Sequence, residues 1–187
     1  MADVTISQLS LGTPNKNSAV IPYSDGSTTL STAPSGIVAA SPGALIQVQF
    51  THLTSGFRTA SNSYQRVYGV SITPKSINSK ILINASVLMC AESWNPGPPF
   101  INLRRNTTEL TYQRPNNWAG SASDTYNNPF NVNLQFLDST ANTTSSIDYN
   151  ICVASAGQGY NTTVNFRADG NDVIHGYSTI TAMEIAG

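Results

Sequence analysis

The feature that most constrains the fold is an alternation with a period of two between Ser79 and Cys90. One face of this segment carries Ile81, Ile83, Ala85, Val87 and Met89, and the other carries Asn84 and Ser86, with Leu82 and Leu88 at either end. Successive side chains of a β-strand point to opposite faces, whereas those of a helix repeat every 3.6 residues. The segment therefore predicts a strand, and its two leucines make the second face partly apolar.

The same period recurs along the rest of the chain. Further predicted strands cover residues 44–50, 64–72, 100–105, 109–112, 130–138, 147–153, 163–167 and 177–185. In the first of these, Ile46, Val48 and Phe50 fall on one face, and Gln47 and Gln49 fall on the other. No segment shows a helical period of useful length. About eight to ten short strands separated by turns predict an all-β jelly-roll β-sandwich.

The composition changes near residue 43. Residues 1–43 are rich in Ser, Thr, Gly, Pro and Ala, and have too little apolar surface to fold alone. A flexible tail is one interpretation. The favoured one is an extended N-terminal arm that attaches to a particle, because isolated apolar side chains are unusual in a solvated linker. The predicted attachment residues are Val4, Ile6, Leu9, Leu11, Val20, Ile21 and Tyr23. Residues 44–187 form the predicted folded domain.

The low charge excludes several classes of partner. Only 10% of the residues are charged, and nine Lys and Arg oppose ten Asp and Glu, for a net charge of -1. Such a chain has no field that would attract nucleic acid or an anionic membrane. No stretch approaches the length of a transmembrane helix. The start, Met1-Ala2-Asp3-Val4, lacks the regions of a signal peptide, so we do not expect export by that route.

Residues capable of chemistry are few. His52 and His175 have no second ligand at a metal-binding spacing, and the segment Asp169-Gly170-Asn171-Asp172 lacks the full calcium-loop pattern. Nothing in the sequence selects a catalytic pair among the acidic residues Glu92, Glu109, Asp138 and Asp148. We therefore expect no enzyme activity, no cofactor and no metal.

Three smaller features have two interpretations each. Arg104 and Arg105 either end a strand in solvent, which we favour, or meet an acidic partner. Cys90 and Cys152 fall on the polar phase of their strands and are expected to be free thiols. The polar loop of residues 113–129 contains Trp118 and Tyr126, which either cap the end of the sandwich or contact a glycan; capping is favoured.

Four segments between Ala44 and Ala186 together resemble segments of a known group of proteins. They are Ile72-Thr73-Pro74 with Ser79-Lys80-Ile81-Leu82-Ile83, then Phe100-Ile101-Asn102-Leu103-Arg104-Arg105-Asn106-Thr107, then Phe136-Leu137-Asp138-Ser139 with Asp148-Tyr149-Asn150-Ile151, and finally Ser178-Thr179-Ile180-Thr181-Ala182-Met183-Glu184-Ile185-Ala186. As a set they resemble the trimeric jelly-roll modules in virion proteins of tailed bacteriophages, particularly aquatic ones. The segments Val4-Thr5-Ile6-Ser7-Gln8-Leu9 and Ala19-Val20-Ile21-Pro22-Tyr23 resemble phage attachment segments.

The resemblance implies a jelly roll like that of tumour necrosis factor and the complement head, assembled as a homotrimer. A three-fold assembly buries one sheet face of each protomer, so strands that are apolar on both faces fit it. Aromatic residues are enriched in interface cores, although they also fill sandwich cores. The predicted trimer-interface residues are Tyr64, Tyr68, Leu82, Leu88, Tyr149 and Phe166.

The function implied by the resemblance is that of a virion structural protein. The leading hypothesis is a capsid decoration (cement) protein on the outer surface of the particle, assembled in the host cytoplasm, whose partner is the major capsid protein or another virion protein. The alternative is a short tail fibre or receptor-binding tip that recognises host surface glycan. A depolymerase or lyase is a third, less favoured class.

Overall fold

The computed structural model describes residues 41–91, 99–115, 129–155, 161–166, 173–174 and 176–187. The chain divides into two compact units, Met1–Ser41 and Pro42–Gly187, close to the predicted boundary at residue 43. The predicted attachment residues of the arm lie outside the described residues, as do Trp118, Tyr126 and His175. All strands described below belong to the second unit.

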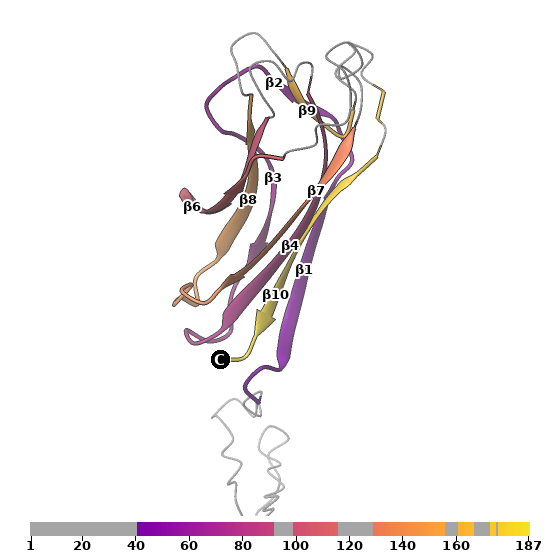
Figure 1. Ribbon diagram of the computed structural model, residues 1–187. Helices are drawn as coiled ribbons and strands as arrows, with labels where there is room; N and C mark the ends of the chain where they lie inside the picture. Colours follow the sequence, from indigo (N-terminus) through magenta and orange to yellow (C-terminus); the bar gives the residue numbers. More distant parts are fainter. Residues whose placement is uncertain (1–40, 92–98, 116–128, 156–160, 167–172, 175) are drawn as a thin grey trace, which may run out of the picture. The chain divides into compact units, whose positions relative to one another are not determined.

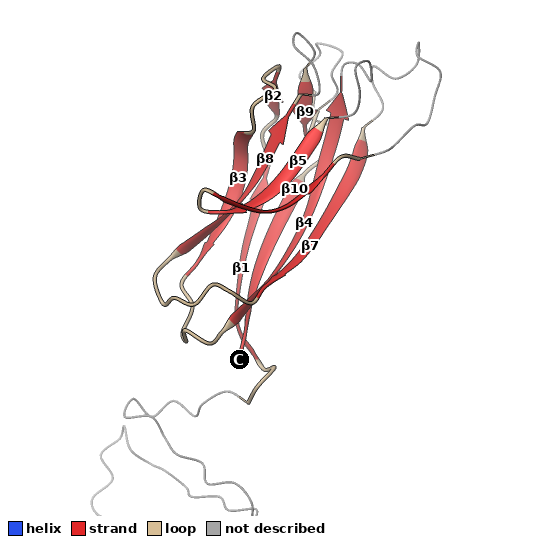
Figure 2. Cartoon of the chain, turned by 60° about the vertical axis from the view of Figure 1, so that its left-hand side comes forward, coloured by secondary structure: helices blue, strands red, loops and turns tan. Residues whose placement is uncertain are grey.

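The described residues form strands and no helix, so the prediction of an all-β fold is confirmed (Figures 1 and 2). The strands are β1 (Leu45–Leu53), β2 (Phe57–Thr59), β3 (Gln65–Ile72), β4 (Lys80–Ala91), β5 (Phe100–Arg105), β6 (Thr108–Gln113), β7 (Phe130–Asp138), β8 (Ile147–Ala154), β9 (Thr162–Val164) and β10 (Ser178–Ile185). All pairings between them are antiparallel and make two sheets, as in a β-sandwich. No described helix is long and apolar enough to cross a membrane.

The first sheet is built around β4. Strand β7 pairs with β4 on one side, from Ile81 to Met89, and β10 and β9 share the other side. Beyond them, β1 pairs with β10 and β2 with β9. The second sheet has the order β3-β8-β5-β6.

The core lies between the two sheets. Strand β4 contributes Ile81, Ile83, Val87 and Met89, and the second sheet contributes a facing set of Tyr68, Val70, Ile72, Ile101, Leu103, Tyr149 and Ile151. The face predicted to be apolar in β4 is therefore the core face. In β1 the alternating apolar residues Val48 and Phe50 are about half-exposed, at 48% and 57%, and point away from the core.

Two polar residues join β9 and β10 where the ladder along β4 is interrupted. The backbone N–H of Leu88 donates to Ser178 Oγ at 3.0 Å, and the Leu88 carbonyl accepts from the N–H of Asn165 at 2.9 Å. Asn165 also donates through Nδ2 to the carbonyls of Leu53 and Ser55, at 2.7 and 3.0 Å. Its φ of 68° places it in the left-handed region, which asparagine tolerates better than most residues. Buried backbone groups need partners, so this junction replaces the missing ladder bonds.

A buried carboxylate connects the two sheets. Asp138, at the end of β7, accepts bonds from Arg105 Nη1 of β5 at 2.9 and 3.0 Å and from the Tyr149 hydroxyl of β8 at 2.8 Å. The backbone N–H and the hydroxyl of Thr140 donate to the same group. The prediction that Arg105 ends its strand in solvent is therefore wrong, because its guanidinium pairs with a carboxylate that is 1% exposed.

The strands also give the domain two distinct ends. At one end, the N–H of Gly43 donates to the carbonyl of Ala186 and the N–H of Ala186 donates to the carbonyl of Ala44, both at 2.8 Å. Residues 1–40 therefore precede a segment that is fixed beside the C-terminus. Strands β2 and β9 lie at the opposite end of the sandwich (Figure 1).

Candidate assembly interface

Four strands place an apolar row across the outer face of the first sheet. Val48 of β1 pairs with Met183 of β10, Met183 pairs with Leu82 of β4, and Leu82 pairs with Leu137 of β7. Directly paired residues of antiparallel strands point to the same face. Val48 and Leu137, at the two ends of the row, are 48% and 47% exposed, whereas Leu82 and Met183 are half-buried. The row is thus an apolar surface that the isolated chain leaves open.

Two further rows, polar except for Phe50, lie beside the apolar one. The first contains Phe50, Thr181, Asn84 and Gln135, and the second contains His52, Thr179, Ser86 and Asn133. Gln135 Nε2 donates to Asn84 Oδ1 at 2.9 Å. A shallow hollow lies over these polar side chains of β4, β7 and β10. The ring of Phe50 stands 5.9 Å from that of His52, so β1 adds aromatic surface at the edge.

The three rows contain no charged residue, although the exposed Lys80 at the start of β4 lies on the same side of the sheet as Leu82. On the second sheet, Arg66 pairs with Asp148 at 3.0 Å and Arg104 lies opposite Glu109 in the β5–β6 register. The cores of protein–protein interfaces are depleted in charge and enriched in apolar side chains. By that measure, the outer face of the first sheet is the better candidate for assembly. We call the residues of its three rows the uncharged face.

The structure divides the six predicted trimer-interface residues into three groups. Leu82 belongs to the uncharged face, and Leu88 lies on the same outer side of β4. Tyr68, Tyr149 and Phe166 are buried within the single chain at 6%, 0% and 7% exposure, so they have no surface for a partner and their assignment to the interface is corrected. Tyr64 lies beside the second sheet, with the guanidinium of Arg104 at 5.2 Å from its ring.

Sequence reasoning missed most of this face because its members come from four separate strands. The out-of-phase Leu82 was the one signal that pointed to it. Val48 and Phe50 obey the period of two, but the period does not reveal which face of an edge strand is turned toward the core. Met183 and Leu137 each lie in a well-predicted strand, and only the register brings them together.

The acidic residues considered above as catalytic candidates form ion pairs and hydrogen bonds within the domain. Asp138 is bound by Arg105 and Tyr149, Asp148 pairs with Arg66, and Glu109 accepts a bond from Asn102 Nδ2 at 2.6 Å. No group of three His, Cys, Asp or Glu side chains capable of holding a metal occurs among the described residues. Cys90 and Cys152 are both buried and are not joined in a disulfide, and burial raises the pKa of the Cys152 thiol.

Glu184 is a second buried carboxylate that the sequence did not single out. It is fully buried and accepts from Ser79 Oγ at 2.6 Å, from the N–H of Lys75 at 2.7 Å and from Gln47 Nε2 at 2.5 Å. Burial acts to raise the pKa of Glu184, but these bonds outweigh it and lower the pKa. Its role is to hold the segment before β4 against β10 and β1.

Comparison with known proteins leaves the family open. No family model matches the chain, and no curated protein matches it. Among solved structures it is similar to dimeric latent PorU from Porphyromonas gingivalis, with 9% sequence identity and a TM-score of 0.36 over 78% of this chain. The chain spans 14% of the length of PorU. A likeness this weak says nothing about function.

Proposed function

We propose that residues 42–187 form a jelly roll. Apart from the three-residue strands β2 and β9, the sheets have the orders β1-β10-β4-β7 and β3-β8-β5-β6. Among these eight strands in chain order, the first pairs with the last and the second pairs with the seventh. A jelly roll is an eight-stranded double-sheet fold of two Greek keys, in which strands distant in sequence pair in this way.

The jelly roll assembles as a homotrimer through the uncharged face. The observation that carries this proposal is the apolar row of Val48, Met183, Leu82 and Leu137, which crosses the sheet without a charge. Three copies closing around one axis would remove this row from water. A stable subunit contact of this kind buries about 1,000 Å² or more in total.

The function that fits this arrangement is a virion structural protein, and within that class a capsid decoration protein. In each copy the arm joins the folded unit just before Gly43 and Ala44, which pair with Ala186. Binding to the assembled shell but not to free subunits stabilises the shell by mass action. The sequence resemblance to phage virion modules supports this choice.

The arm provides the test. Because Gly43 and Ala44 belong to the folded unit, the deletion should end at residue 40. We expect the shortened chain to sediment as a trimer and to lose binding to purified particles, while the full chain coats them. Coating by the shortened chain at the full-length level would refute attachment through the arm.

A short tail fibre or receptor-binding tip is the competing function. It uses the same trimer but differs in copy number. We expect a copy number per particle comparable with that of the major capsid protein. A number typical of a tail component, measured on a gel of purified particles, would favour the fibre.

A further inference from the structure

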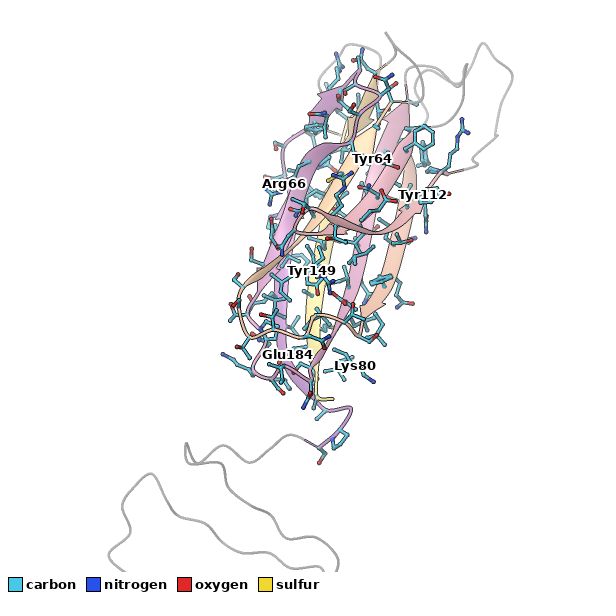
Figure 3. All side chains as sticks on the ribbon, turned by 90° about the vertical axis from the view of Figure 1, so that its left-hand side faces the viewer. Tyr64, Arg66, Lys80, Tyr112, Tyr149 and Glu184 are labelled. Carbon is cyan, nitrogen blue, oxygen red and sulfur yellow. The ribbon has the colours of Figure 1, made fainter. Side chains whose placement is uncertain are left out.

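The outer face of the second sheet carries a cluster that the proposed function does not use. It comprises Tyr64 before β3, Arg66 of β3, Asn102 and Arg104 of β5, and Glu109 and Tyr112 of β6. Asn102 pairs in register with Tyr112, and Arg104 pairs with Glu109. Figure 3 looks toward this side of the molecule, with Arg66 and Tyr112 at opposite margins and Tyr64 between them. We call these six residues the tyrosine–arginine cluster.

Two buried polar atoms of the cluster have no hydrogen-bond partner among the residues that the structure describes. They are Asn102 Oδ1, an acceptor on a fully buried side chain, and Arg104 Nε, a donor. The amide nitrogen of Asn102 is already used by Glu109, at 2.6 Å. Buried polar groups without partners are rare and cost about 1–3 kcal/mol each. The unpaired acceptor and the unpaired donor lie two residues apart on one strand. A ligand group that both donates and accepts hydrogen bonds could therefore satisfy both atoms.

The cluster also offers aromatic surface beside these atoms. Tyr112 is 61% exposed, and Tyr64 lies under the guanidinium of Arg104 at 5.2 Å. The pKa of Tyr64 is raised by burial and by the charge of Glu109, which places that carboxylate near the same ring. Apolar faces of pyranose rings pack on tyrosine rings, and their hydroxyls both donate and accept hydrogen bonds.

Each arginine of the cluster has an acidic neighbour, and one of these neighbours, Asp148, lies beside the cluster. Arg104 lies opposite Glu109, and Arg66 pairs with Asp148 at 3.0 Å. A site for phosphate, sulfate or a carboxylate would carry an excess of unpaired basic groups. The arginines already have acidic neighbours, and a hydroxyl group could pair with both orphan atoms. These two observations favour a neutral ligand that carries hydroxyl groups.

We propose that the tyrosine–arginine cluster binds a neutral saccharide. One sugar hydroxyl accepts from Arg104 Nε and donates to Asn102 Oδ1, and the ring lies against Tyr112. Both orphan atoms are covered in the free chain, so binding requires side chains at the rim of the cluster to move. This inference goes beyond the proposed function and does not depend on trimer formation, because the cluster lies on the other sheet.

The test uses the full chain on an array of neutral hexose-based oligosaccharides that also carries sialylated and sulfated members. We expect binding to neutral members and a loss of roughly fivefold in Tyr112→Ala, since one aromatic contact contributes on the order of 1 kcal/mol and 1.4 kcal/mol corresponds to a factor of ten. Tyr177→Ala is the matched control, because Tyr177 is similarly exposed, at 65%, and lies outside the cluster.

Three results would overturn the saccharide site: no binding to any neutral member, binding confined to charged members, or equal binding by Tyr112→Ala and the parent chain. Sedimentation of the same samples separates this outcome from failure of the trimer. A trimer without saccharide binding refutes only the site, and a monomer that binds saccharide refutes only the trimer.

Discussion

At the scale of single residues, two buried carboxylates connect strands that are distant in the sequence. Nothing in the sequence predicted this role for either residue. Asp138 connects β7 to β5 and β8, and Glu184 connects β10 to β1 and to the segment before β4. Each lies within a strand that the period of two predicted. That period does not show that either carboxylate is buried and bonded. What distinguishes them is the set of donors that the fold brings to them, and those donors are distant in sequence.

These carboxylates predict acid lability. Burial acts to raise the pKa of Asp138 and of Glu184, but the donors around them lower both below the ordinary values of 3.8 and 4.5. A group with a depressed pKa in the folded state stabilises the fold above its ordinary pKa, and this stabilisation is lost as the pH falls through the folded value. We expect the urea concentration at the unfolding midpoint to be constant near neutral pH and to decrease once the pH is lower than about 4.

Substitution of Asp138 checks the assignment. Asp138→Asn leaves the guanidinium of Arg105 without its counter-charge, and we expect a loss of about 2–3 kcal/mol at pH 7 together with a weaker dependence on pH. Asp148→Asn is the control, because its partner Arg66 has a side chain that is 60% exposed. An equally large loss in the control would remove the special role of Asp138.

At the scale of elements, the sequence predicted where strands lie better than how they pair. The predicted segments 100–105 and 130–138 coincide with β5 and β7, and 79–90 is nearly β4. The short strand β2 was missed, since three residues carry no measurable period. Residues 163–167 were expected to be one strand, but β9 ends at Val164 because Asn165 turns the backbone into the left-handed region. Register depends on contacts between distant segments, which a single sequence does not display.

The junction of β9 and β10 gives a prediction at this scale. Asn165→Ala removes the side-chain bonds to Leu53, Ser55 and Ser178 and places alanine, which tolerates the left-handed region less well than asparagine, at positive φ. Asn165→Gly removes the same bonds but tolerates that φ. We expect both to be destabilised in urea, with alanine worse than glycine by about 1 kcal/mol, the usual cost of the left-handed region. Equal losses would mean that φ at this position carries no strain.

At the scale of the whole molecule, the three rows of the uncharged face carry no charge, whereas the outer face of the second sheet carries several charged residues. Composition predicted the low overall charge, but the distribution of the few charges follows from register and could not be predicted. Arg66, Arg104, Glu109 and Asp148 all fall on the second sheet, which leaves the apolar row of the first sheet without a charge. The proposed trimer and the proposed saccharide site therefore occupy opposite faces and do not compete.

A lysine placed on each outer face in turn tests whether the uncharged face forms the trimer contact. Leu82→Lys inserts an ammonium into the middle of the apolar row, and Ser71→Lys places the same group on the exposed outer side of β3. An unpaired charge buried in an interface costs several kcal/mol, whereas a surface lysine costs little. We expect the parent chain and Ser71→Lys to sediment as trimers and Leu82→Lys as a folded monomer with unchanged thermal stability per chain. If Leu82→Lys remained trimeric, the three-fold contact would have to lie elsewhere; if the parent were monomeric at micromolar concentration, the uncharged face would need a partner other than its own copies.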